Sequence, residues 1–128
     1  MTQTNIEFIE GAVAAFNRGD QDAGLEAMAP SFELDLSRAT GPFKGVYGPE
    51  AVRGFLDEFW ASWETLHVKP LEFIEAGDLT VVPVRLQATG RGGIEVTARP
   101  TWVWTIRDGA IERMVMYQER EDALADLP

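Results

Sequence analysis

The sequence contains no cysteine and only one histidine among its 128 residues. The absence of cysteine excludes a disulfide framework, a thiolate metal site and a cysteine nucleophile, and it fits a cytoplasmic protein. The single histidine, His67 in "LHVKP", has no carboxylate pair at ligand spacing, so we interpret it as a strand residue and expect no metal. No cofactor is expected either, since no helix follows "GRGG" to make it a phosphate-binding loop.

Basic residues are also few, with 11 Lys and Arg against 21 Asp and Glu and a net charge of −10. This charge would repel a phosphate backbone or an anionic membrane, so neither nucleic acid nor a membrane is an expected partner. No apolar run approaches the roughly 18 residues of a membrane span, and "MTQTNIEFIE" has no basic segment typical of a signal peptide. The length and the 45% apolar content predict one globular domain over 1–128.

Apolar residues recur at helical spacing in three segments. The first runs from Ile6 to Phe16 and is followed by "NRGD", whose glycine is suited to end a helix. A short second helix is expected before Pro30, and a third within "GPEAVRGFLDEFWASW". The apolar stripe of the third helix would comprise Val52, Phe55, Leu56, Phe59 and Trp63.

Strict alternation in "SFELDLS" (31–37) predicts a half-buried strand. Further strands are expected at 66–75, 79–89, 94–106 and 110–119. The short links "AGD", "GRGG" and "RDG" favour antiparallel neighbours, with Pro70, Pro83 and Pro100 at edges or bulges. Together these elements predict an α+β fold in which a long, curved, mostly antiparallel sheet wraps around three helices and leaves a cone with an internal pocket.

Three stretches carry a resemblance to a known family: "AAFNRGDQDAGLEAM", "GVYGPEAVRGFLDEFW" and "VWTIRDGAIERMVMYQEREDAL". They resemble the SnoaL-like group of small bacterial proteins, within the nuclear-transport-factor-2-like superfamily. The resemblance implies a cystatin-like α+β cone, a homodimer and a mostly apolar pocket. Members include ketosteroid isomerase, polyketide cyclases and limonene-epoxide hydrolase, so it also implies small-molecule binding with cyclase-type or isomerase-type chemistry as a further step.

The resemblance can be tested residue by residue against ketosteroid isomerase, which needs a carboxylate base and an oxyanion hole of a tyrosine and a protonated aspartate. The tyrosine position falls near Ala12, the base near Leu36 and the second aspartate near Trp102, and none of the three residue types is kept. A slip of one residue would bring Asp35 to the base position, but would also turn the apolar face of its strand outward. Steroid-isomerase chemistry is therefore not expected.

The other two chemistries also lack their residues. The Asp–Arg–Asp set of the epoxide hydrolase falls near Met116 and on "PTW", where only Arg99 matches. The late-strand aspartate of the cyclases has no counterpart between 109 and 121, and Glu119 lies on the face assigned outward. Asp35 and Arg99 are left as the catalytic candidates. Alternation from Trp102 places Arg99 outside, unless a bulge at Pro100 turns it inward, where Asp35 or Glu95 could neutralise it.

The expected partner is a small apolar or aromatic molecule, because aromatic and thioether side chains suit a flat ligand. The predicted pocket residues are Phe16, Leu34, Leu36, Phe59, Trp63, Trp102, Trp104, Met114, Met116 and Gln118. The alternative is that these side chains fill the cone. The protein would then be a non-catalytic dimerisation or assembly module whose working surface is an outward sheet face with Val103, Val115 and Tyr117.

Overall fold

The computed structural model describes residues 5–39 and 42–127 and confirms the expected α+β class. Its helices are α1 (Asn5–Asn17), α2 (Gln21–Glu26), α3 (Val52–Ala61) and α4 (Arg120–Ala125). Its strands are β1 (Met28–Leu36), β2 (Gly45–Tyr47), β3 (Trp63–Pro70), β4 (Ile74–Ala76), β5 (Leu79–Gly90), β6 (Glu95–Ala98), β7 (Thr101–Arg107) and β8 (Ala110–Tyr117). None of the helices in the described part of the chain is long and apolar enough to cross a membrane.

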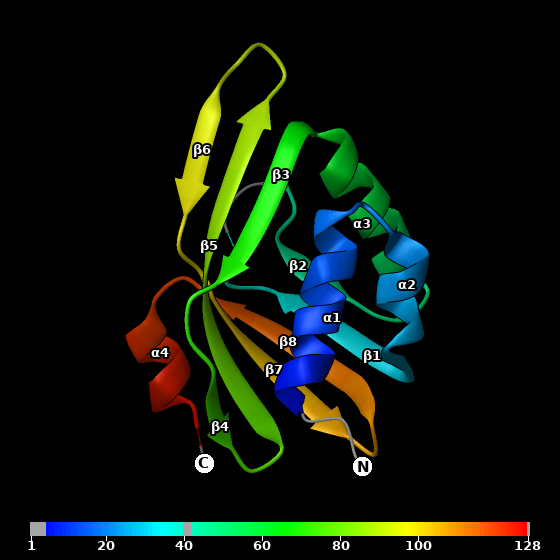
Figure 1. Ribbon diagram of the computed structural model, residues 1–128, viewed down its shortest axis with the longest axis vertical. Coiled ribbons are helices and arrows are strands. Elements are labelled where there is room, and N and C mark those ends of the chain that lie inside the picture. Colours follow the sequence, from blue (N-terminus) through cyan, green and yellow to red (C-terminus); the bar gives the residue numbers. More distant parts are fainter. Residues whose placement is uncertain (1–4, 40–41, 128) are drawn as a thin grey trace.

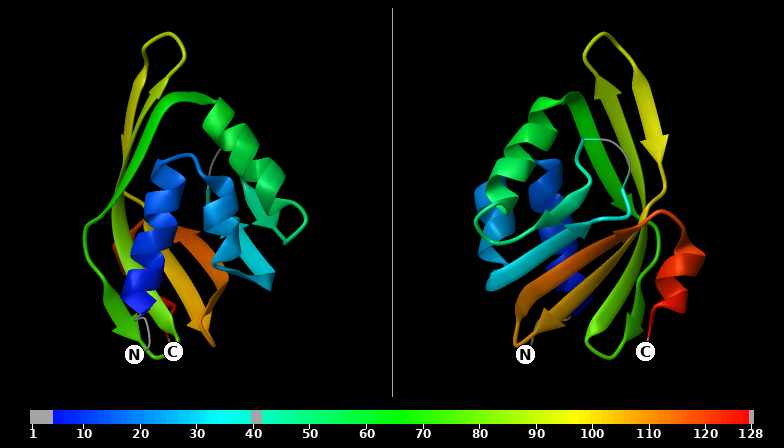
Figure 2. Two further views of the ribbon diagram at one scale, coloured as in Figure 1. Left: turned by 45° about the vertical axis from the view of Figure 1, so that its right-hand side comes forward. Right: turned by 180° about the vertical axis from the view of Figure 1, so that it is seen from behind.

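All strands belong to one curved, unclosed sheet with the order β2-β1-β8-β7-β5-β3, to which β4 and β6 are added through pairing with β5. Every pair is antiparallel except β1 with β8, which are parallel. Helices α1, α2 and α3 lie on the concave face, whereas α4 lies on the opposite face (Figures 1 and 2). The hairpin of β5 and β6 projects beyond the helices at one end (Figure 2). The cone expected from the sequence is thus confirmed, with a sheet that stays open.

Several element bounds differ from those expected. The run 66–75 is two strands, β3 and β4, and the run 94–106 is β6 and β7. The breaks fall after Pro70 and at Pro100, because proline has no N–H with which to continue a ladder. Strand β2 lies in the stretch expected to be a glycine-rich loop, and Trp63 begins β3 rather than extending the third helix.

Two tight turns behave as their residues predict. Gly19 follows α1 with a positive φ of 70°, and the side chain of Asp20 then caps α2 by accepting a hydrogen bond from the Ala23 N–H at 3.1 Å. Asp108 and Gly109 link β7 to β8 with φ values of 52° and 73°. A two-residue hairpin needs this left-handed pair because its twist matches that of the flanking strands.

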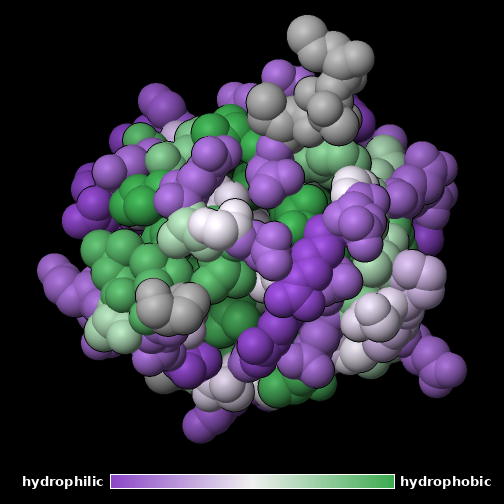
Figure 3. Space-filling view, turned by 90° about the horizontal axis from the view of Figure 1, so that it is seen from below, coloured by the Kyte–Doolittle hydropathy of each residue, from purple (hydrophilic) through white to green (hydrophobic). Residues whose placement is uncertain are grey.

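The sheet buries apolar side chains on both faces. The concave face and the three helices share one core, made by Ile9, Ala12, Val13, Phe32, Leu34, Val52, Phe55, Val68, Val82, Val84, Trp104, Ile106, Ile111 and Met114. The convex face has a second cluster of Val81, Val103, Val115 and Tyr117, which packs against Ala123 of α4. In Figure 3, apolar side chains gather on the left, the side on which α4 and β4 lie.

This second cluster corrects one expectation. Val103, Val115 and Tyr117 were expected to form an outward working surface in the alternative of a filled cone. Each is only 7% exposed. Because α4 covers them within the same chain, these three side chains are not exposed as a working surface.

One side chain joins the helical layer to the edge of the sheet. The Asn17 side-chain Nδ2 group donates to the Val68 carbonyl at 2.9 Å, and the Asn17 side-chain Oδ1 accepts from the Val68 N–H at 2.9 Å. Among the described strands, β3 pairs only with β5, so these bonds satisfy backbone groups on its outer edge. Asn17 therefore fixes the last residue of α1 against the strand it covers.

We expect Asn17→Ala to lower the free energy of unfolding by about 1–3 kcal/mol, because it leaves a partly buried donor and acceptor unpaired. Asn17→Asp keeps only the hydrogen-bond acceptor, so its free energy of unfolding should lie between those of Asn17→Ala and the wild type. Urea denaturation measures the difference, with Gln87→Ala at an exposed strand position as the control. Equal stability of Asn17→Ala and the wild type would contradict the assigned role of this side chain.

Candidate functional site

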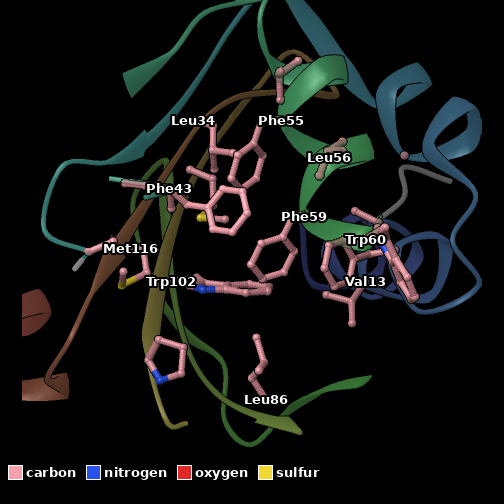
Figure 4. A pocket seen from close by; sticks show the side chains of 18 of the residues that line it. Val13, Leu34, Phe43, Phe55, Leu56, Phe59, Trp60, Leu86, Trp102 and Met116 are labelled. Carbon is pink, nitrogen blue, oxygen red and sulfur yellow. The ribbon is translucent and has the colours of Figure 1, made fainter. Parts of the chain in front are cut away.

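A cavity of about 400 Å³ lies between the concave face of the sheet and helices α1, α2 and α3. The elements that enclose it each contribute their inward residues, since alternation along a strand and the 3.6-residue repeat of a helix both select one face. Figure 4 shows Phe59 of α3, Trp102 of β7 and Phe43 directed into the same space. The cone is therefore not filled by its own side chains.

Aromatic rings form one wall of the cavity. Phe55 and Phe59 lie one helical turn apart on α3, and their rings stack with centroids 5.6 Å apart. Phe43 meets both rings edge-on, at 5.6 Å from Phe55 and 5.2 Å from Phe59. On the sheet side of the cavity, the rings of Trp102 and Trp104 in β7 have centroids 6.0 Å apart and meet edge to face. These are separations and orientations that aromatic pairs prefer, so the rings support one another in this arrangement.

The structure places every predicted pocket residue along this one cavity. They are Phe16, Leu34, Leu36, Phe59, Trp63, Trp102, Trp104, Met114, Met116 and Gln118. Their role in binding stays a prediction. Residues that line the cavity but were not predicted to do so include Phe43, Phe55, Trp60 and Leu86. The period of the third helix could have identified Phe55, and alternation along "VVPVRL" could have identified Leu86, whereas Phe43 lies in a loop without any periodic signal.

Few polar side chains reach the cavity. Among its lining residues only Asp20, Gln21, Arg99 and Gln118 have polar side chains other than tryptophan. Asp20 already caps α2, and the Gln118 Nε2 group donates to the Arg38 carbonyl at 2.9 Å. The described residues also contain no group of three metal-ligating side chains. The lining of the cavity is therefore mostly apolar.

Asp35 does not supply an acid to the cavity. It lies on the opposite face of β1, where it is 7% exposed and accepts hydrogen bonds from the Ser37 N–H at 2.9 Å and the Ser37 hydroxyl at 2.6 Å. An Arg113 guanidinium nitrogen on the parallel strand β8 donates to its other oxygen at 3.0 Å. Asp35 was one of the two catalytic candidates, but its carboxylate lies outside the cavity. The positive charge of Arg113 compensates there for the burial of the ionised group.

The same contacts set the titration of Asp35. Burial raises the pKa of this carboxyl, but the hydrogen bonds from Ser37 and the positive charges of Arg113 and Arg38 outweigh burial. The net result is a pKa below its ordinary value, so Asp35 is ionised at neutral pH.

Arg99, the other catalytic candidate, borders the cavity between Ala98 and Pro100. Strand β5 keeps one register from β6 into β7, and the Val84 N–H donates to the Pro100 carbonyl at 3.0 Å at the junction. No bulge intervenes, so alternation places Arg99 on the outer face, opposite to Ala98. Arg99 therefore lies outside, as alternation from Trp102 predicts, and the alternative of an inward turn at a Pro100 bulge is not observed. Neither Asp35 nor Glu95 pairs with Arg99.

A model of the SnoaL-like domain matches residues 9–114. The chain belongs to the SnoaL-like domain family.

Solved structures agree with this assignment. The SnoaL-like domain described here is similar to TerC co-crystallised with polyporic acid, at 28% identity, with 96% of each chain covered and a TM-score of 0.79. It is also similar to a Mycobacterium tuberculosis protein in complex with estradiol-17β-hemisuccinate, at 19% identity, with 91% of this chain and 94% of that chain covered and a TM-score of 0.78.

A third similar structure is the Δ5-3-ketosteroid isomerase from a Mycobacterium species, at 18% identity, with 91% of this chain and 93% of that chain covered and a TM-score of 0.77. The likenesses below 25% identity establish a shared fold of the nuclear-transport-factor-2-like kind. The sequence matches no curated protein.

Three cavity positions correspond to the catalytic residues of ketosteroid isomerase. Ala12, Leu36 and Trp102 occupy the positions that the resemblance assigns to the tyrosine, the base and the second aspartate. All three line the cavity of this SnoaL-like domain. None of the three has an ionisable side chain, so these positions offer no general acid or base.

We expect Asp35→Asn to lower the free energy of unfolding by about 2 kcal/mol at neutral pH, because it weakens charge-assisted bonds with Ser37 and Arg113. The folded-state pKa lies below the unfolded value of 3.8, so ionised Asp35 stabilises the fold above that value and this contribution is lost as the pH falls through the folded-state pKa. The difference from wild type should therefore shrink below pH 3.8.

Urea denaturation at neutral pH and at about pH 3 measures this change. Glu121→Gln, at an exposed position of α4, is the control and should change stability by less than about 0.5 kcal/mol. A deficit of Asp35→Asn that is the same at both pH values would exclude the charge as its cause.

Proposed function

We propose that this SnoaL-like domain binds a flat, largely apolar small molecule in the cavity. The observation that carries the proposal is the preformed space of about 400 Å³, enclosed on one side by aromatic rings of α3 and on the other by Trp102 and Trp104. Sites for small molecules have volumes of roughly 300–1,000 Å³, and they too are mostly apolar with few polar groups. The cavity matches both properties.

The class of ligand follows from the shape and chemistry of the lining. Trp102 and Phe59 approach the cavity from β7 and α3, so a planar ring system between them would contact aromatic surface on both sides (Figure 4). Polycyclic aromatic compounds and steroid-like compounds have this form. Support comes from similar structures that hold polyporic acid and a steroid ester, since these are ring systems of the proposed size.

Binding has more support than catalysis. A cyclase-type or isomerase-type reaction needs a titratable group within hydrogen-bond reach of the reacting atom. Asp35 faces away from the cavity, Arg99 belongs to the outer face, and Asp20 is engaged at the start of α2. The proposed role is therefore to hold a ligand out of water and in one orientation.

We expect Trp102→Ala to weaken binding of polyporic acid or estradiol by about tenfold or more, because the variant loses an aromatic contact surface on the ligand. Isothermal calorimetry gives the affinity, and ligand-induced thermal stabilisation gives an independent measure. Leu71→Ala removes an apolar side chain that is 48% exposed and outside the cavity lining, and it should bind as the wild type does. Equal affinities of Trp102→Ala and Leu71→Ala would place the ligand elsewhere.

We also expect a Δ5-3-ketosteroid to bind without being isomerised, because the cavity positions Ala12, Leu36 and Trp102 offer no base and no oxyanion donor pair. The double-bond shift is followed by ultraviolet absorbance under conditions in which calorimetry shows the steroid to be bound. Turnover above the buffer rate that survives Asp35→Asn would reveal a catalytic group not identified above.

A further inference from the structure

Three basic side chains lie in one row across the convex face of the sheet. Lys69 of β3 pairs in register with Arg85 of β5, and the register of β5 with β6 and β7 places Arg99, at the junction of β6 and β7, opposite Arg85 on the other side. The residue before each of them faces the core or the cavity, so alternation turns the three basic side chains outward. Neighbouring strands lie about 4.8 Å apart, so this cationic row of Lys69, Arg85 and Arg99 spans about 10 Å.

The chain does not neutralise the cationic row with its own acids. In the described part of the chain, no carboxylate forms an ion pair with any of its three members. Glu72, three residues after Lys69, is held by Arg120 at 3.1 and 3.3 Å. Like charges directly opposite each other on neighbouring strands destabilise a sheet. In a chain with 21 acidic and 11 basic residues, three adjacent cations without an acidic partner therefore indicate that an anion from outside the chain supplies the missing charge.

The central member of the row also has an unsatisfied donor. The Nε atom of Arg85 is buried and has no hydrogen-bond partner among the described residues. Buried donors without an acceptor are rare in folded proteins, because each loses its hydration without compensation. Arg85 is half-buried, whereas Lys69 and Arg99 on either side of it are exposed. An anion that reached the Arg85 guanidinium would therefore also come within range of two exposed cations.

Neutral polar side chains extend this surface along the strands. The next outward positions are His67 on β3, Gln87 on β5 and Thr97 on β6, which are opposite one another in register. All three are exposed. Imidazole, amide and hydroxyl groups can each donate a hydrogen bond to an anionic oxygen. Two adjacent rows of the sheet therefore present donors, and neither row contains an acid.

We propose that the cationic row binds a diphosphate group. Guanidinium groups match phosphate oxygens with paired hydrogen bonds, and a lysine adds a further charge. A single phosphate is short compared with a row of about 10 Å, whereas the two linked phosphates of a diphosphate can reach Arg85 and both of its neighbours. The higher charge of a diphosphate also offsets more of the repulsion within the row.

The charge of the whole protein limits the size of the anion. The net charge is −10, so a long polyanion such as nucleic acid would be repelled by the rest of the surface. The Debye length at physiological ionic strength is about 8 Å, so a compact anion interacts mainly with the cations nearest to it. The side chains of the row face away from the cavity, and this inference does not rest on the proposed binding of an apolar ligand.

Calorimetry with inorganic pyrophosphate, in metal-free buffer of low ionic strength, tests the site. The wild type should bind pyrophosphate at least about tenfold more tightly than phosphate, because the longer anion contacts more of the row. Arg85→Met should weaken pyrophosphate binding by about tenfold or more, since it removes the central charge. Arg53→Met is the matched control. It changes the net charge equally, but on α3, where Arg53 pairs with Asp22 and Asp57, and it should leave the affinity within about twofold.

Thermal unfolding gives a second measure of the same site. Repulsion within the row predicts a higher Tm for Arg85→Met than for the wild type at low salt, and this difference should shrink as salt is added. Saturating pyrophosphate should raise the Tm of the wild type by about 2 °C or more and leave that of Arg85→Met unchanged. Lys69→Gln and Arg99→Gln, at exposed positions, should each weaken binding by about threefold, so the test does not depend on the folding of Arg85→Met.

Adenosine diphosphate distinguishes the two sources of the group. An affinity equal to that of pyrophosphate assigns the row to a diphosphate ester, and binding of pyrophosphate alone assigns it to the free ion. The proposal would be overturned by a wild type that does not bind millimolar pyrophosphate, by phosphate binding as tightly as pyrophosphate, or by equal losses of affinity in Arg85→Met and Arg53→Met.

Discussion

The alternation of side chains along β5 is the constraint on which the other elements depend. This strand pairs with β3, β4, β6 and β7, so its even positions set the concave face for most of the sheet. Val82 and Val84 point into the core below the helices, while Val81 and Arg85 point to the convex side. A slip of one residue would exchange these faces and turn Arg85 toward the cavity. Burial of apolar side chains on both faces therefore fixes the register of β5.

The interior of the cone combines a cluster of packed rings with a mostly apolar lining. Its rings are packed against one another at 5.2 to 6.0 Å, and they need little reorganisation to accept a flat guest. Asp35 of β1 and Arg113 of β8 point to the convex side, where the positive charge of Arg113 favours the ionised form of Asp35. Selectivity in such a site comes from shape and desolvation. A ligand that buries an unsatisfied polar group in such a site would lose more affinity than a ligand that lacks one methyl group.

The fold and most of the cavity could be predicted because they follow from local periodicity. Phe32, Leu34 and Leu36 alternate in the sequence as they do in β1, and Trp102 and Trp104 do the same in β7. What could not be predicted depends on long-range contacts. Asp35 is buried by an arginine 78 residues away on a parallel neighbour, and Phe43 reaches the cavity from a loop that has no periodic pattern. Proline positions showed where pairing would be interrupted, but not that β6 would end free of a second neighbour.

All four tryptophans of the chain line the cavity: Trp60, Trp63, Trp102 and Trp104. No indole elsewhere in the protein contributes to its near-ultraviolet spectrum, so the emission of the native protein comes from the cavity walls. Entry of a guest would change the polarity around these rings, and a guest that absorbs near their emission would accept their excitation energy. The protein thus contains its own optical probe of occupancy, and a titration of unlabelled protein would report on the site rather than on the whole molecule.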